Sequence, residues 1–236
     1  MDNNKLLKIW KDDIESFLGD KDPRPEEYHS HTLHQTLDHS YIWPFDSSYR
    51  VLEVGPGDGC HTVVLADVCK WVTVIEARPN NLAKVFLRTK FYNQNNLSFQ
   101  LGNVQEIDES CGRYDGVFHF GVLYHLSEPV RHIRNLAKIT DLVLCDTHIG
   151  DQLSDRWDEG EHQAHRYKEY GWADQLSGVD NWSRWLTKES MFNAFQEAGF
   201  EFIYLQLEYD IKLSPRIRFI ASKNKLKKSP YSEINE

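Results

Sequence analysis

The sequence has little cysteine and no long hydrophobic run. It contains four cysteines among 236 residues and no C-x-x-C pair, so neither a disulfide framework nor a zinc site is expected. No stretch approaches the roughly 18 apolar residues that a membrane-spanning helix needs. The first residues are polar, with acidic side chains at Asp12 and Asp13, and lack the apolar segment of a signal peptide. These absences predict a cytoplasmic protein with no membrane partner.

Basic residues are also in short supply. Lys and Arg number 27 against 36 Asp and Glu, which gives a net charge of -9. Because nonspecific phosphate binding depends on clustered Lys and Arg, nucleic acid is not favoured as a partner, although a local basic patch is compatible with this total. Four of the 11 histidines lie close together, whereas a metal site would need two pairs at ligand spacing together with nearby acid or thiol groups. No metal is therefore predicted, and these four are interpreted as part of a polar N-terminal segment covering a site: His29, His31, His34 and His39.

Two familiar nucleotide-binding motifs are missing, although three alternate glycines follow an apolar run at Gly55, Gly57 and Gly59. The dinucleotide fingerprint needs Gly or Ala five positions after its first glycine, where this sequence has Cys60 or Thr62. No Gly-Lys-Ser/Thr occurs, which excludes a phosphate loop. The glycines fit a strand-to-helix turn in which bare backbone and free helix N–H groups meet a polar ligand. A tight turn with no ligand is the alternative.

Short apolar runs alternate with helix-sized stretches after residue 49, which is typical of an α/β protein. Helices are expected after the glycine turn, at Pro79, after Leu126 with Ser127 as the cap, and after Thr187. The two last strands are expected to pair antiparallel at the sheet edge. The predicted fold is an α/β, Rossmann-like sheet of seven mostly parallel strands with helices on both faces. The predicted strands are Arg50–Val54, Trp71–Glu76, Leu97–Leu101, Tyr114–Phe120, Asp141–Thr147, Glu201–Tyr209 and Ile211–Ser222.

A single domain is expected over residues 1–236, divided into five segments. Residues 150–186 form a connection far longer than the roughly 15 residues usual between elements. The connection is rich in Trp and Tyr, which favours a lid over a ligand rather than a disordered linker. The other predicted segments are a helical N-terminal cap, a cofactor-binding core, the C-terminal part of the sheet and a flexible tail, at residues 1–49, 50–149, 187–222 and 223–236.

The glycine turn carries a resemblance to a known family. The pattern E-x-G-x-G-x-G, which begins at Glu53, resembles motif I of the class I S-adenosylmethionine-dependent methyltransferases. The resemblance implies S-adenosylmethionine as the cofactor, held at the glycine turn. It also implies that Glu76 binds the ribose hydroxyls and that the segment with Asn103 and Val104 borders the adenine. At Asn103 the family usually has an acid.

The stretch from Gly121 to Ile133 is similar to the same region of the bacterial tRNA wobble-uridine carboxymethyl transferases. This similarity implies that Gly121 and Tyr124 lie at the cofactor, with Tyr124 near the transferred group. Related Leu-x-His turns occur widely among methyltransferases of small molecules. The likeness therefore indicates where the cofactor lies more than what the substrate is.

Ligands in open α/β sheets bind beyond the carboxyl ends of the strands, which directs attention to His125 and His148. Either is a candidate base or substrate contact, and a structural role is the alternative for each. Tyr167, Trp182 and Arg184 of the lid are the candidate substrate contacts, with packing or a cation–π contact within the lid as the alternative.

Three functions remain open from the sequence. The favoured one is a methyltransferase acting on a small-molecule acceptor by in-line transfer. An RNA-modifying methyl or carboxymethyl transferase is the second, and a cofactor-binding scaffold without turnover is the third. The acceptor and the oligomeric state are not determined by the sequence.

Overall fold

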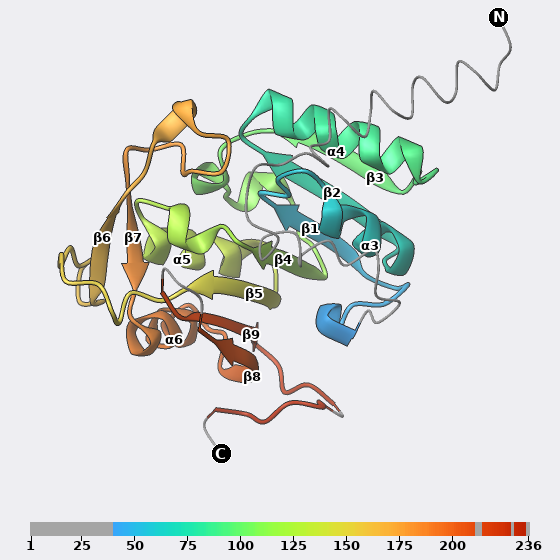
Figure 1. Cartoon of the computed structure of the whole chain (residues 1–236). Helices are drawn as coiled ribbons and strands as arrows, with labels where there is room; N and C mark the ends of the chain where they lie inside the picture. Colours follow the sequence, from blue (N-terminus) through green and yellow to red (C-terminus); the bar gives the residue numbers. More distant parts are fainter. Residues whose placement is uncertain (1–39, 211–213, 228, 235–236) are drawn as a thin grey trace, which may run out of the picture.

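The central element is a seven-stranded sheet with the order β3-β2-β1-β4-β5-β9-β8. The structure is a computed structural model and describes residues 40–210, 214–227 and 229–234 (Figure 1). Strands β1 to β5 are parallel, whereas β9 runs antiparallel to both β5 and β8. This arrangement confirms the predicted fold class. The strands are β1 Arg50–Val54, β2 Trp71–Glu76, β3 Leu97–Leu101, β4 Gly116–Phe120, β5 Leu142–His148, β8 Phe202–Tyr209 and β9 Arg216–Ser222.

Two pairs of helices cover the two faces of the sheet and create two hydrophobic cores. Strand side chains alternate between the faces, so Val51 packs toward α3 and α4 while Leu52 packs toward α5 and α6. Both strand residues are fully buried. The helices are α3 Cys60–Val68, α4 Pro79–Phe91, α5 Pro129–Ile139 and α6 Lys188–Glu197.

The helix starts follow the sequence signals with one exception. Pro79 occupies the first turn of α4, and the Thr187 side chain caps α6 by accepting from the Ser190 N–H at 3.3 Å. The prediction of Ser127 as the cap of α5 is wrong, because residue 128 takes the cap position without a side-chain bond. The first N–H groups of α5 instead donate to the Glu159 carboxylate at 3.0 and 2.9 Å. The Glu159 carboxylate, from a distant part of the chain, therefore caps the N-terminus of α5 in place of a local side chain.

The long connection between β5 and α6 has secondary structure of its own. It contains a two-stranded antiparallel sheet, β6 Ala164–Lys168 and β7 Trp182–Leu186, and a short 3-10 helix, η6 Gly171–Ala173. We call residues 150–186 the insertion. Figure 1 shows β6 and β7 beside α5, and the Arg184 N–H donates to the Leu126 carbonyl at 2.9 Å. The insertion therefore packs on the loop that follows β4.

The two ends of the chain differ from the sequence expectations. Most of the predicted N-terminal cap, with its four histidines, lies outside the described residues, and residues 40–49 contain only the 3-10 helix Ser40–Ile42. The tail expected to be flexible adds to the sheet edge in its described part. The Leu205 N–H donates to the Ser232 carbonyl at 3.2 Å, and Ile234 donates to Ile203 at 2.9 Å. Edge strand β8 thereby gains partners for its backbone groups.

None of the helices in the described part of the chain is long and apolar enough to cross a bilayer.

Candidate active site

The glycine turn between β1 and α3 has an open side. Gly55, Gly57 and Gly59 have φ angles of +59°, +61° and +85°, a region that favours glycine. A Cβ at Gly55 would lie 2.4 Å from a Val122 methyl, and one at Gly59 would lie 3.0 Å from the Val85 Cα. A Cβ at Gly57 would meet no atom within 4 Å. Two of the glycines therefore serve packing, while the third borders space that a ligand can use.

Two buried carboxyl groups flank this turn. Glu53 is 1% exposed, its Oε2 has no hydrogen-bond partner among the described residues, and burial raises its pKa to about 8. Burial also raises the pKa of Glu76, against the opposing effect of hydrogen bonds from the Arg78 and Gly57 N–H groups. The Arg78 N–H lies 2.8 Å from Glu76 Oε1. A buried acceptor without a partner, beside an open glycine turn, fits a cofactor with amino and hydroxyl groups.

The predicted adenine segment follows β3 as expected. Asn103 caps the 3-10 helix Val104–Glu106, and its Oδ1 accepts from the Gln105 N–H at 3.1 Å. This bond commits the amide oxygen to the backbone. Val104 is buried in the core. Directly after β4, Gly121 has φ +73° and its N–H donates to the Asp146 carbonyl at 2.9 Å. The cofactor contacts of these residues stay predictions.

Aromatic rings from three elements meet beyond the end of β4. The Tyr124 ring lies 4.6 Å from that of His148 and 5.4 Å from that of Trp185. His148 stacks on Trp185 at 4.7 Å, and its Nδ1 lies 3.1 Å from the Ser214 carbonyl. Burial and the Arg216 charge lower the pKa of His148 to about 3. An imidazole with so low a pKa stays neutral and is a weak base, which disfavours His148 as the proton acceptor.

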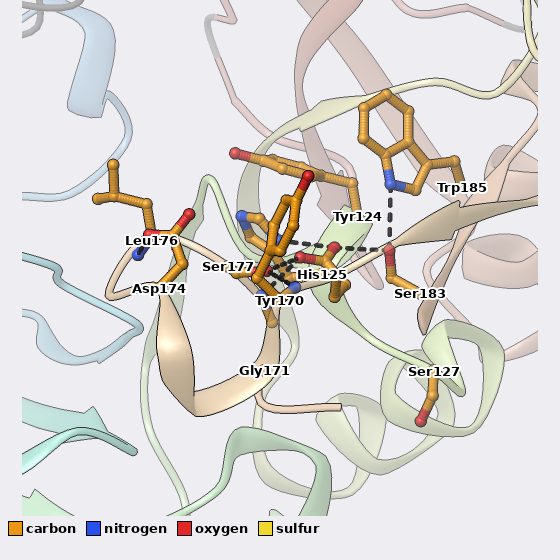
Figure 2. A network of polar contacts seen from close by, with 12 residues as sticks. Tyr124, His125, Ser127, Tyr170, Gly171, Asp174, Leu176, Ser177, Ser183 and Trp185 are labelled. Carbon is orange, nitrogen blue, oxygen red and sulfur yellow. Dashed lines mark hydrogen bonds and ion pairs between the residues drawn. The ribbon is translucent and has the colours of Figure 1, made fainter. Parts of the chain in front are cut away.

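His125 has a different environment, because a buried carboxylate of the insertion holds it (Figure 2). Its Nδ1 lies 3.0 Å from Oε1 of Glu169, a side chain that is only 2% exposed, while the His125 side chain is 21% exposed. The same carboxylate accepts from the hydroxyls of Ser177 at 2.5 Å and Ser183 at 2.7 Å, and from the Gly178 N–H at 2.7 Å. Burial opposes ionisation of Glu169, but the hydrogen bonds from His125 and the serines hold its pKa below the usual value.

An acceptor-only carboxylate fixes the tautomer of its partner. Because Glu169 accepts only, the neutral form of His125 carries its proton on Nδ1 and has its lone pair on Nε2. Sequence reasoning missed Glu169, since a single acid in a segment without a motif gives no signal.

A second polar cluster, also missed, joins β5 to β9. The Asp146 carboxylate accepts from Arg216 Nη2 at 2.6 Å and from Arg218 Nε at 2.9 Å. Burial opposes ionisation of Asp146, but the two guanidinium charges hold its pKa below the usual value. Two arginines at alternate positions of an otherwise apolar strand, next to the strand that bears Asp146, were the available signal.

The candidate substrate residues of the insertion are engaged with protein groups. Arg184 donates to the Ser127 carbonyl and, at 3.0 Å, to the Trp157 carbonyl, and its guanidinium lies 3.8 Å from the centre of the Trp157 ring. These contacts hold β7 against the core, which is the alternative foreseen for Arg184. Tyr167 stacks on Trp185 at 4.4 Å, whereas Trp182 is 38% exposed. Nothing in these contacts places Tyr167 or Trp182 on a substrate.

The insertion is also tied to the loops that follow β2, β3 and β4. Arg78 donates to the Gly171 carbonyl at 2.8 Å. The Asp180 carboxylate accepts from Gln105 Nε2 at 2.8 Å and from the Ser127 hydroxyl at 2.6 Å. The insertion therefore spans the carboxyl ends of these three strands, beside the predicted ribose and adenine contacts.

Comparison with known proteins decides the family. A family model described as a methyltransferase domain matches residues 6–205. The chain belongs to this family. The predictions of a class I S-adenosylmethionine-dependent methyltransferase fold, enzyme class and cofactor are thereby confirmed.

The matches to individual relatives cover different shares of this methyltransferase chain. The N-terminal domain of EvdMO1, solved with S-adenosylhomocysteine (SAH) bound, is 25% identical over 73% of this chain and 74% of that chain, with a TM-score of 0.66. A protein-L-isoaspartate O-methyltransferase of Rhodopseudomonas palustris (strain BisB5) is 28% identical over 85 residues, 36% of this chain. A tRNA U34 carboxymethyltransferase of Campylobacter concisus (strain 13826) is 33% identical over 54 residues, 22% of this chain. The matches span 39% and 19% of the length of these two curated relatives.

Proposed function

We propose that this chain methylates a small-molecule acceptor and that His125 takes the proton from the acceptor's nucleophilic oxygen or nitrogen. The observation that carries the proposal is the His125–Glu169 pair. It places an imidazole with a fixed tautomer on the loop that follows β4, at the edge of the sheet where ligands bind in open α/β folds. Half of the pair comes from the insertion, so the base is complete only when the insertion is docked on the core.

A small acceptor is favoured by the way the insertion is held. Hydrogen bonds at the loops after β2, β3 and β4 fix it over the carboxyl ends of these strands. Such a cover suits a ligand that is enclosed and shielded from water. The net charge of -9 also disfavours a long polyanion as the acceptor.

The chain's own residues divide the work. The glycine turn, Glu53 and Glu76 would hold the cofactor, which supplies an electrophilic methyl group on a sulfonium when bound. His125 Nε2 accepts the acceptor's proton, and the Glu169 carboxylate stabilises the imidazolium that results. Ser177 and Ser183 keep this carboxylate ionised and oriented by donating to it. Docking of the insertion excludes water and aligns the acceptor.

The test uses S-adenosylmethionine labelled in its methyl group, a pool of cellular metabolites and, separately, bulk tRNA. We expect label in the metabolites, and a loss of turnover of about 100-fold or more in His125→Gln with unchanged affinity for SAH. The matched control is His162→Gln, because His162 is a second histidine whose ring nitrogen faces a carboxylate, 3.1 Å from Glu197. Turnover in His162→Gln should stay close to that of the parent. Equal turnover in both variants would remove His125 from the mechanism.

A second candidate, transfer to tRNA, is favoured by the 54-residue similarity to the tRNA U34 carboxymethyltransferase. Label in tRNA but not in the metabolites would establish it. Label in neither, with SAH still bound, would favour the scaffold that lacks turnover.

A further inference from the structure

The cluster of Asp146, Arg216 and Arg218 has a net positive charge, because two guanidinium groups face a single carboxylate. Both guanidinium groups contact one carboxylate, and the side chains are only 11% and 14% exposed for the arginines and 3% for the acid. Placing a net positive charge in such a position is costly unless an anion or water compensates it. The cluster therefore favours a negatively charged ligand.

Arg218 is the residue of this cluster that has unused hydrogen-bond donors. Among the described residues its only hydrogen bond is from Nε to Asp146, so both terminal NH2 groups remain for another partner. Its guanidinium lies 4.7 Å from the centre of the Phe120 ring and 5.7 Å from that of Tyr41. Arg216, in contrast, uses Nε and Nη2 for Asp146 and places Nη1 3.5 Å from the Tyr124 hydroxyl. Arg216 thus positions the carboxylate, while Arg218 presents a fork of free donors between aromatic faces.

The cluster adjoins the methyl-transfer site described above. In the sheet register Asp146 lies beside Phe120 on one side and Arg218 on the other. The Asp146 carbonyl also accepts from the Gly121 N–H, at the start of the loop that bears His125. On the other side the Phe120 ring lies 5.5 Å from that of His61, in the first turn after the glycine turn.

We propose that Arg218 binds an anionic group, a carboxylate or a phosphate, of the methyl acceptor. This inference rests on the proposed function and adds the substrate class to it: a small acid with a planar or apolar body that contacts Phe120 and Tyr41. A guanidinium fork matches both anions through two parallel hydrogen bonds. The ligand charge completes the neutralisation that Asp146 begins.

The first test is calorimetry on the SAH-saturated protein with benzoate and its neutral isostere benzamide as probes. We expect benzoate to bind, benzamide to bind at least tenfold more weakly, and Arg218→Gln to raise the Kd for benzoate at least tenfold. Arg218→Lys keeps the charge beside Asp146 but loses the fork, so its Kd should lie between those of the parent and Arg218→Gln. Thermal unfolding verifies that both variants fold.

Arg166→Gln is the matched control. Arg166 also donates through Nε to an aspartate, 2.9 Å from Asp155, and lies over an aromatic ring, 4.6 Å from the centre of Trp182. It belongs to the insertion and should leave benzoate binding unchanged. Equal binding of benzoate and benzamide, or equal loss in Arg166→Gln and Arg218→Gln, would overturn the proposal.

A second measurement separates the acceptor from the cofactor, whose amino-acid part also carries a carboxylate. SAH and 5′-methylthioadenosine, which lacks the amino-acid part, are titrated into the parent and Arg218→Gln. We expect the same Kd in both proteins for each ligand. A tenfold loss for SAH alone would assign Arg218 to the cofactor and overturn the inference. Methyl label in a neutral metabolite would also overturn it while the proposed function stands. If Arg218→Gln loses benzoate binding but no metabolite is labelled, the anion site is supported while the proposed methylation of a small molecule is rejected.

Discussion

At the scale of single residues, Gly57 and Gly160 allow a clean test of the cofactor turn. Both have φ +61°, and a Cβ on either would meet no atom within 4 Å. Alanine should therefore cost each position the same backbone strain, about 1 kcal/mol of unfolding free energy. Only at Gly57 does the added methyl group point into the predicted cofactor space, so Gly57→Ala should weaken SAH binding at least tenfold, as measured by calorimetry. Equal affinities in Gly57→Ala and Gly160→Ala would separate the cofactor from this turn.

The His125 tautomer is the second prediction at this scale. Nitrogen-15 NMR of the ring should show the proton on Nδ1, because Glu169 accepts from that atom. His162 provides an internal reference in the same spectrum, since Glu197 accepts from its Nε2. In Glu169→Gln, the amide oxygen should stay with the donors Ser177 and Gly178, which turns the amide NH2 toward His125 Nδ1. An NH2 group donates and needs an acceptor, so we expect the Nδ1–H form of His125 to fall below half of the population. An unchanged His125 signal in this variant would remove Glu169 as its positioning residue.

The sequence predicted the residues that belong to a short motif and missed those that meet only in space. The glycine turn and Glu76 were predicted from the resemblance of short motifs at the ends of β1 and β2 to a known family, and their cofactor contacts stay predictions. Glu169 reaches His125 across 44 positions of sequence, and Asp146 reaches Arg218 across 72. Only the packing of the insertion and the pairing of β5 with β9 bring these groups together. Arg184, a predicted substrate contact between two tryptophans, donates to two backbone carbonyls and lies over the Trp157 ring, contacts that fit the structural alternative.

At the scale of elements, the continuous apolar runs defined the parallel strands well. Strands β1, β2 and β3 have the predicted bounds. β1 and β2 are buried after their first residue, as expected of central parallel strands, whereas β3 is half-buried to exposed and alternates apolar with polar residues. The β6–β7 hairpin was not predicted as strands. These two strands contain Trp, Arg and Lys and lack a regular alternation of apolar and polar residues. In β7, Trp185 is buried against the core, whereas Trp182 is exposed to solvent.

The insertion should loosen when its anchor to the core is removed. Arg184→Gln loses the bonds to the Ser127 and Trp157 carbonyls and the Trp157 ring contact. Together these should cost about 1–3 kcal/mol of stability, and hydrogen exchange in residues 150–186 should accelerate. Arg166→Gln, within the same hairpin but paired with the exposed Asp155, is the control and should leave exchange at the core contacts unchanged. The same rates in both variants would show that Arg184 does not anchor the insertion.

At the scale of the whole molecule, buried titratable groups set the dependence of stability on pH. His119 of β4 and His132 of α5 lie on the same side of the sheet, with their Nε2 atoms 2.9 Å apart and each side chain 1% exposed. Burial lowers the pKa of His119 to about 4 and holds that of His132 well below its usual value. His148 belongs to the same class, with a pKa of about 3. Glu53 behaves oppositely, because burial raises its pKa to about 8.

The signs of these shifts predict maximal stability near pH 6.5. From about pH 8 down to 4.5, folded Glu53 holds a proton that the unfolded chain lacks, so its contribution to stability rises as pH falls. Below about pH 6.5 the unfolded chain also binds three protons, on His119, His132 and His148. In the folded chain these histidines stay neutral, because their pKa values are lowered. Between pH 6.5 and 4.5 the unfolded chain therefore binds up to three additional protons on the histidines, and the folded chain binds one on Glu53. This net difference of two protons lowers the unfolding free energy by at most about 3 kcal/mol per pH unit. Urea unfolding at pH 5.0, 5.75 and 6.5 measures this slope.

The buried histidine pair should account for most of the loss. Leucine has nearly the volume of histidine, and replacing both partners of a buried hydrogen bond by apolar groups is close to neutral at high pH. In His119→Leu/His132→Leu, His148 remains on one side and the carboxyls with raised pKa values, Glu53 and Glu76, on the other. Their effects have opposite signs, so the positive slope between pH 6.5 and 4.5 should be lost. Carboxylates with lowered pKa values, such as Asp146 and Glu169, lose their stabilising charge only at still lower pH. They should leave this window untouched in parent and variant alike. A double variant that folds but retains the slope of the parent would assign acid sensitivity to groups other than this pair.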